Sequence, residues 1–300
     1  MQKSSEFLVV SKSSYLLASF GRVACHTSLI AGAFVVIAAA LKNFFGLQYK
    51  VAFQRRFFKA TNKVPVSAVD TSLDEVIPFR PAYVQTYMDF TTFWIRIVGF
   101  LIKTASDKRL GSAAIKDIRG FLNTIAAIYL HAAEVYRVNM STTKRPAYYG
   151  NFQFVVIHLV DPHLMCIPSL HVMLAIASYT MFADIMGKWR QDEALHALSG
   201  PVRGHALAIS SSILFVKQHS VNCISAAMYA MYKFNARLFP LNEAYQFVKD
   251  LPLGEIPGEI QTKIIEYIRK KFDLFLKQGE NSGDWKAPLL DFLSQNDPSF

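Results

Sequence analysis

Apolar stretches of helical length follow one another along most of this 300-residue chain. The first covers residues 23–41, carries no formal charge and has roughly the 20 residues needed to cross a bilayer. Later stretches carry few charges and predict helices over residues 83–103, 113–138, 152–160, 170–186, 205–216 and 220–234. No strand-like alternation persists. The pattern therefore predicts an all-α fold, a helical bundle.

A group of basic residues follows the first apolar stretch with no acidic residue among them: Lys42, Lys50, Arg55, Arg56, Lys59 and Lys63. Beside a spanning helix, such a group normally stays cytoplasmic and contacts anionic lipid. A buried core helix and a secretory signal are the alternatives, but Arg22 and the lack of a small-residue cleavage motif argue against a signal. We predict an integral protein of the inner or cell membrane that contacts an anionic membrane surface.

The pattern of residues changes at two points along the chain. Pro78 and Pro81 mark a linker over residues 73–81. After Pro240, apolar residues recur at helical spacing, and basic residues lie on the other faces of the same segment. The apolar residues are Ile260, Ile264, Ile268, Phe272 and Phe275. This amphipathic helix either packs on the bundle or binds a membrane surface. We therefore predict an N-terminal membrane segment with its basic flank (1–64), a helical bundle (65–237) and an amphipathic C-terminal extension (238–300).

Composition narrows the choice of partners. Charged residues make up 18% of the chain, against roughly 25% in soluble domains. The net charge of +10 favours anionic partners such as lipid headgroups or phosphorylated substrates. Nucleic acid is not expected, because no zinc finger, RNP-type motif or basic heptad occurs. Cys25, Cys166 and Cys223 lie far apart in apolar sequence, which indicates buried small side chains rather than a metal site or disulfide framework.

Polar residues stand just before the apolar run of residues 170–186. Pro168 suits the start of a helix, and Ser169 there can cap the helix or donate to a bound oxyanion. Free backbone amides and the helix dipole make such a start an anion site. His171, in the first turn, could protonate a leaving oxygen. By itself the segment is equally compatible with a capped helix that carries an incidental histidine.

Two other segments carry related chemistry. Lys217, Gln218 and His219 interrupt a long apolar run, where unsatisfied polar groups are costly. A lysine beside a histidine suits phosphate binding next to a nucleophilic imidazole, although a snorkelling lysine beside a core histidine is the plainer interpretation. Arg145 precedes a proline and can bind phosphate through two N–H groups, although an isolated basic pair is commonly solvated. Together the segments predict one phosphate-handling site on neighbouring helices.

The order Arg-Pro, Pro-Ser-x-His and Ser-x6-His resembles the three-part signature of the phosphatidic acid phosphatase type 2 and haloperoxidase superfamily, over residues 85–235. Residues 167–172 resemble the branch with leucine between serine and histidine, and Ser212 with the Lys-Gln-His tripeptide resembles its third block. The first block departs from the pattern, because Val138 stands where the family's leading lysine usually falls. The resemblance implies a membrane-associated phosphatase of a lipid phosphate or related phosphomonoester, built on the family's helical bundle.

The resemblance also implies a role for each matching residue. His219 would be the nucleophile that forms a phosphohistidine, and His171 would be the general acid for the departing alcohol. The substrate phosphate would be bound by Arg145, Lys144, Ser169 and Lys217. No cofactor and no metal are implied, because these cations would stabilise the charge of the transition state.

One position departs from the family's mechanism. The aspartate that would orient the imidazole, four residues after the nucleophilic histidine, is Cys223 here, and a neutral thiol is a poor acceptor. Asn222, expected on the same helix face as His219, is the predicted substitute. The sequence thus predicts a phosphatase weakened by Cys223. A non-catalytic phosphate- or headgroup-binding or interaction protein, a lipid headgroup phosphotransferase and a structural membrane protein with chance motif matches stay open.

Overall fold

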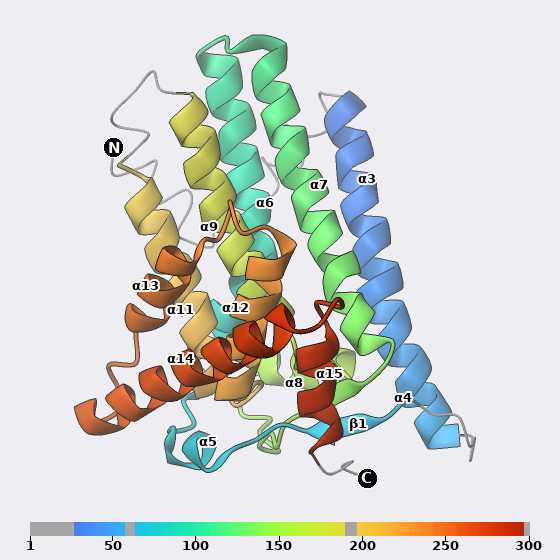
Figure 1. The fold of residues 1–300 in the computed structure, drawn as a ribbon. Helices are drawn as coiled ribbons and strands as arrows, with labels where there is room; N and C mark the ends of the chain where they lie inside the picture. The colour runs from blue at the N-terminus through green and yellow to red at the C-terminus, as the bar shows by residue number, and fades with distance from the viewer. Residues whose placement is uncertain (1–26, 58–63, 190–196, 297–300) are drawn as a thin grey trace.

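The computed structural model describes residues 27–57, 64–189 and 197–296, and most of them lie in helices (Figure 1). The longer helices are α3 (Thr27–Ala40), α4 (Leu47–Phe57), α6 (Val84–Asp107), α7 (Gly111–Tyr136), α9 (Leu170–Lys188), α11 (Ser199–Phe215), α12 (Val221–Phe234) and α14 (Gly258–Glu280). The shorter ones are α5 (Ser72–Val76), α8 (Phe152–Val160), α13 (Leu241–Lys249), α15 (Ala287–Ser294), the π-helix η1 (Leu41–Gly46) and the 3-10 helix η2 (Pro81–Tyr83). The predicted all-α class is confirmed.

The predicted helices of the bundle correspond to α6, α7, α8, α9, α11 and α12. α11 begins at Ser199 rather than at residue 205, because its first turns also find tertiary partners. Val202 is buried, and Arg203 pairs with Glu243 and Asp250 at 2.9 and 2.8 Å. The predicted linker over residues 73–81 contains the short helix α5, which Thr71 caps.

Two three-residue strands were not predicted, since three residues are too few for an alternating pattern. β1 (Val66–Ala68) and β2 (Met140–Thr142) pair in parallel. The middle residue of β2, Ser141, also holds the segment that leads into α9. Its amide donates to the Leu164 carbonyl at 3.0 Å, and its hydroxyl accepts from the Ile167 amide at 2.7 Å. The small sheet therefore fixes the approach to the Pro-Ser-Leu-His motif.

α9 and α12 lie at the centre of the bundle, and residues 170–180 and 221–231 are all buried. α6, α7 and α11 pack around α9. α3 runs along α7 at one edge (Figure 1), and the two helices approach closely where Gly32 faces Leu122. A Cβ atom on Gly32 would lie 3.0 Å from Leu122 Cδ1. α3 is thus packed against the bundle through a small residue.

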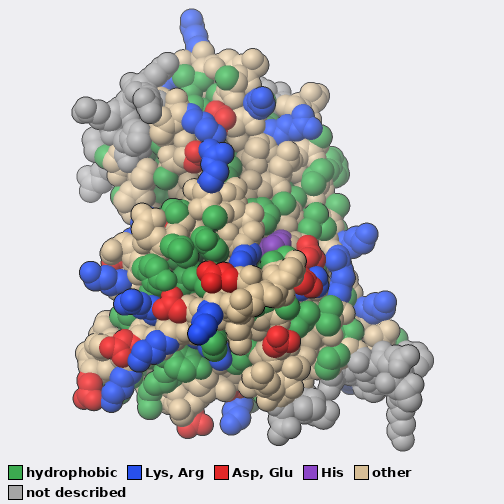
Figure 2. Space-filling model, in the orientation of Figure 1, with side chains coloured by type: hydrophobic (Ala, Val, Ile, Leu, Met, Phe, Trp, Pro, Cys, Tyr) green, Lys and Arg blue, Asp and Glu red, His purple; other side chains and the backbone are tan. Residues whose placement is uncertain are grey.

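The C-terminal amphipathic helix packs on the bundle, which decides between the two alternatives left by the sequence. Ile264, Ile268, Phe272 and Phe275 of α14 are buried, and α14 lies against α12. The Ser225 hydroxyl of α12 donates to the Ile268 carbonyl at 3.2 Å. Charged side chains of both signs are scattered among hydrophobic and uncharged ones over the lower half of the face shown in Figure 2, where α14 lies.

A buried ionic cluster joins α6 to α11. Arg96, only 1% exposed, donates to both carboxylate oxygens of Asp89 at 2.6 and 2.5 Å. His205 of α11 lies 2.6 Å from the same carboxylate. Burial opposes ionisation of Asp89, but the bonds from Arg96 and His205 outweigh it and lower the pKa of that carboxyl. The cluster therefore links α6 to α11 through a buried carboxylate with partners on both helices.

Two helices of the described residues, Thr27–Gln54 and Leu170–Lys188, are long and apolar enough to cross a membrane. The second is mostly buried in the bundle, whereas the first presents an exposed apolar face that includes Phe34 and Leu41, 67% and 58% exposed. Residues 23–26 of the predicted span, and the basic residues Lys59 and Lys63, lie outside the described residues.

Candidate active site

Two histidines from separate parts of the chain meet in the core. His171 lies in the first turn of α9, and His219 lies in the turn over residues 216–220 that separates α11 from α12. His219 Nε2 is 3.3 Å from His171 Nδ1, and each residue is 7% exposed. Tyr87 and Phe90 of α6 hold the His171 ring, with ring centroids 4.4 and 3.9 Å away. The structure brings together the two segments that the sequence singled out.

Three buried polar atoms at this point have no hydrogen-bond partner within the described residues: Ser169 Oγ, His171 Nε2 and His219 Nδ1. Ser169 is the N-cap of α9, yet its side chain makes no capping bond. Each buried polar group without a partner costs about 1–3 kcal/mol, so these three atoms favour a shared polar partner such as a water molecule or an oxyanion. An oxyanion can accept from the hydroxyl and from an imidazole N–H.

Asp74 of α5 fastens the turn that carries His219. Its carboxylate accepts from the Ser220 hydroxyl at 2.7 Å and from the Val221 and Thr71 amides at 2.9 and 2.8 Å. Lys217 has a left-handed backbone with φ of 55°, and its ammonium donates to the Asp74 carbonyl. A non-glycine residue in that region costs about 1–2 kcal/mol, so the surrounding bonds impose the turn. The ammonium group of Lys217, which the sequence predicted to bind phosphate, is instead bonded to the backbone of α5.

The two basic residues of the first motif differ in position. Arg145 donates to the Gln218 side chain at 3.3 Å and to the Asp161 carbonyl at 3.0 Å, so its guanidinium lies between the end of α8 and the turn that carries His219. Lys144 is exposed, and its backbone amide donates to the carboxylate of Asp70 at 3.0 Å. Arg145 is therefore brought to the site, and Lys144 is not.

The predicted role of Asn222 is wrong. Ser220 is the N-cap of α12, so His219 precedes the helix and shares no helical face with Asn222 or Cys223. The Asn222 amide nitrogen donates to the Val69 carbonyl, and its oxygen accepts from the Tyr267 hydroxyl, both at 3.0 Å. Cys223 Sγ accepts from the Ser220 amide at 3.3 Å. Burial raises the pKa of the Cys223 thiol, so it is neutral.

Sequence reasoning missed Asp161 and His163, which lie between α8 and α9. His163 Nε2 is 2.8 Å from the Thr143 hydroxyl and 3.8 Å from Cys166 Sγ, and its Nδ1 is 3.9 Å from the Asp161 carboxylate. Burial alone would lower the pKa of His163, but the sulfur of Cys166 and the carboxylate of Asp161 outweigh it and raise that pKa to about 9. His163 is therefore a buried cation near the histidine pair. An Asp-Pro-His tripeptide between two apolar helices was the available signal.

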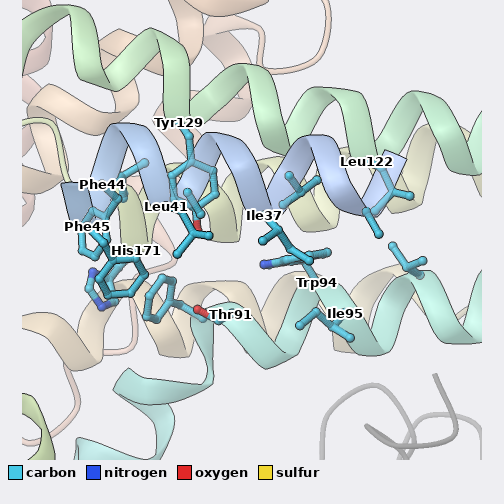
Figure 3. A pocket seen from close by; sticks show the side chains of 16 residues that line it. Ile37, Leu41, Phe44, Phe45, Thr91, Trp94, Ile95, Leu122, Tyr129 and His171 are labelled. Atoms are coloured by element: carbon cyan, nitrogen blue, oxygen red, sulfur yellow. The ribbon is translucent and has the colours of Figure 1, made fainter. Parts of the chain in front are cut away.

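Two cavities meet at His171. The histidine cavity, about 10 Å³, is lined by Phe44, Asp161, His163, Met165, Cys166, Leu170, His171 and His219. The apolar cavity, about 340 Å³, lies between α3, η1, α6 and α7 and also reaches His171 (Figure 3). Trp94, Ile95, Leu122 and Tyr129 are among its walls. The histidine cavity holds no more than about one water molecule, and 3.3 Å between the imidazole nitrogens leaves no room for phosphorus.

Among the described residues, no group of three or more His, Cys, Asp or Glu side chains is arranged to hold a metal ion. No family model, no curated protein and no solved structure matches the chain. The chemistry of the site therefore rests on its own residues: two facing imidazoles, a buried hydroxyl, a guanidinium and a buried imidazolium.

Proposed function

We propose that this protein is a membrane-associated phosphatase that hydrolyses a lipid phosphate through a phosphohistidine at His219. The observation that carries the proposal is that His171 lines both the histidine cavity and the 340 Å³ apolar cavity. An alkyl chain in the apolar cavity brings its ester phosphate to the two imidazoles. The resemblance of the three motifs to the phosphatidic acid phosphatase type 2 superfamily supports the same reaction.

The reaction uses two displacements at phosphorus. Burial lowers the pKa of His171, so it takes up its proton from the acidic hydroxyl of the bound phosphate monoanion. An imidazole nitrogen of His219 attacks phosphorus, the bond to the alcohol oxygen breaks, and the protonated His171 gives that proton to the alcohol oxygen. Water then attacks the phosphohistidine and loses a proton to His171, which releases inorganic phosphate and restores His219. Arg145 and the Ser169 hydroxyl stabilise the charge on the phosphoryl oxygens, and the positive charge of His163 adds to theirs.

The outer face of α3 supports attachment to a membrane. Phe34, Val35 and Leu41 are 67%, 51% and 58% exposed, and such a continuous apolar face indicates contact with lipid. Hydrophobic side chains also gather along the upper right edge of Figure 2, where α3 lies. Lys42 and Lys50, at the end of this face, are exposed and suit an anionic membrane surface.

Phosphate release from the purified protein in detergent micelles is the test. Wild-type kcat/KM is expected to be at least about 100-fold higher for dioleoyl phosphatidate than for glycerol 3-phosphate, because each buried methylene contributes about 0.8 kcal/mol. Malachite-green detection of phosphate measures both rates. Equal values for the two substrates would contradict a chain-binding role for the apolar cavity, and no release from either would contradict the phosphatase itself.

Cys223→Asp is expected to leave kcat close to the wild-type value. His219 precedes α12 and shares no helical face with Cys223, whose Sγ accepts from the Ser220 amide. An aspartate at this position, the third residue of α12, is therefore expected to accept from the amides at the helix start, where the helix dipole favours an acid, and not to reach His219 Nδ1. Cys223→Ser is the control, neutral and of similar size. A clear rise in kcat in the aspartate variant alone would show that position 223 acts on His219.

The missing partner of His219 Nδ1 also favours a second candidate, a non-catalytic protein that binds a phosphate headgroup at the same site. Orthovanadate binding without any phosphate release would support it. A headgroup phosphotransferase differs only in that an alcohol, not water, attacks the phosphohistidine. A labelled lipid donor, with free phosphate and transferred headgroup both measured, distinguishes these two reactions.

A further inference from the structure

The apolar cavity and the histidine cavity are separated by three side chains that line both: Phe44, Leu170 and His171. A phosphate ester whose chain fills the first cavity and whose phosphate reaches the imidazoles has to cross this wall. At about 10 Å³ the histidine cavity cannot hold a phosphate as it stands. At least one of the three side chains therefore moves when such a substrate binds, and the His219 imidazole also moves away from His171, since 3.3 Å between their nitrogens leaves no room for phosphorus.

Two of the three are held in place. Leu170 is the first residue of α9 and is 2% exposed. The first eleven residues of this helix are all buried. His171 is stacked on Tyr87 at an interplanar angle of 21° and also touches Phe90. A close-packed side chain moves only if its neighbours move with it. The wall cannot open at Leu170 or His171 without disturbing the core.

Phe44 is the movable member. It is partly buried and lies on η1, between α3 and α4 at the edge of the bundle. Figure 3 shows Phe44 and Phe45 beside His171 at the end of the apolar cavity. π-Helical turns are uncommon and are often found at functional sites. A Cβ atom on Gly46, the last residue of η1, would lie 3.0 Å from the Leu41 carbonyl oxygen, so glycine suits this turn.

We propose that Phe44 is a gate between the two cavities and determines specificity for phosphates that carry an alkyl chain. The inference rests on the proposed function, because it assigns the chain to the apolar cavity and the phosphate to the histidines. Moving Phe44 loses its contacts, and burial of the chain offsets that loss. A chainless phosphomonoester buries no alkyl chain and therefore gains nothing that offsets the displacement of Phe44. Such a ligand does not favour the open position of Phe44 over the closed one, and so it is excluded, because a ligand shifts an equilibrium only by its preference for one state.

Phe44→Ala tests the gate, with Phe152→Ala as the matched control, since Phe152 is exposed on α8 and lines neither cavity. In Phe44→Ala, kcat/KM for glycerol 3-phosphate is expected to rise at least tenfold, while kcat/KM for dioleoyl phosphatidate changes less than threefold. Phe152→Ala is expected to match wild type on both substrates. An unchanged ratio between the two substrates in Phe44→Ala would overturn the gate.

Orthovanadate gives a readout that does not depend on turnover. Stopped-flow tryptophan fluorescence, with Trp94 in the cavity wall, is expected to show vanadate association at least tenfold faster in Phe44→Ala than in wild type. Equal association rates, or no vanadate binding to either protein, would overturn the gate. Faster vanadate binding in Phe44→Ala without phosphate release from any substrate would support the gate and contradict the proposed hydrolysis.

Discussion

Replacing His219 by alanine is expected to lower phosphate release from dioleoyl phosphatidate at least about 10⁴-fold, because removal of a covalent nucleophile leaves only binding and electrostatic stabilisation. The variant is also expected to lose an acid-labile, alkali-stable phosphoryl label that wild type acquires from labelled substrate. Rapid quenching into alkali, in which phosphohistidine is stable, measures the intermediate directly. A wild-type level of label in His219→Ala would place the nucleophile elsewhere.

Two further variants make this result specific. In the Phe44→Ala background, which admits chainless esters, His171→Asn is expected to lose much more activity on glycerol 3-phosphate than on 4-nitrophenyl phosphate, because a good leaving group needs no general acid. An equal loss on both substrates would contradict the acid role of His171. His131→Ala is the control for removal of a partly buried imidazole. That ring lies on α7 against Trp285, at 3.7 Å between ring centroids, and lines neither cavity.

Asp74→Ala is expected to lower the free energy of unfolding by about 2–4 kcal/mol and kcat about 100-fold. Three donors, the Ser220 hydroxyl and the Val221 and Thr71 amides, lose a charged acceptor, and such hydrogen bonds contribute about 1.5–3 kcal/mol each. Part of that loss is recovered when water reaches the exposed donors. The fall in kcat follows because the turn that carries His219 loses its bonds to the Asp74 carboxylate. A small misplacement of a catalytic group can lower the rate about 100-fold.

Chemical denaturation in detergent, together with kinetics well below the unfolding midpoint, separates the two effects of Asp74→Ala. Glu75→Ala is the matched control, because Glu75 is the exposed neighbour on the same short helix. If Asp74→Ala lowers stability but leaves kcat of the folded protein unchanged, Asp74 is a structural residue only. We expect instead a lower kcat at an unchanged KM.

The hydrophobic pattern predicted the helices of the bundle because each one carries its own signal. α9 and α12 read as apolar runs of helical length, and they are the most buried helices. The amphipathic spacing of Ile264, Ile268 and Phe272 likewise predicted one buried face of α14. The strands β1 and β2 were not predicted, because their pairing joins residues 66–68 to residues 140–142 and produces no pattern within either segment of the sequence.

The misassigned residues share one cause. Asn222 was placed beside His219 on the assumption of one continuous helix, but Ser220 starts a new helix after the turn. Lys217 is drawn to Asp74 by that same turn. A break of a few residues inside an apolar run is set by a distant partner, here the carboxylate of α5, and single-sequence patterns contain no information about it.

By itself the sequence determined the helical class, the positions of most helices and the two motif segments that carry His171 and His219. These follow from local periodicity and from the cost of polar groups in apolar runs. Only the tertiary structure decided that the two imidazoles lie 3.3 Å apart, that Asp74 holds the turn after His219 and His163 lines the same cavity, and that Phe44 lies between them and an apolar cavity. Those features depend on side chains from remote segments meeting in space, which close packing of the whole chain determines.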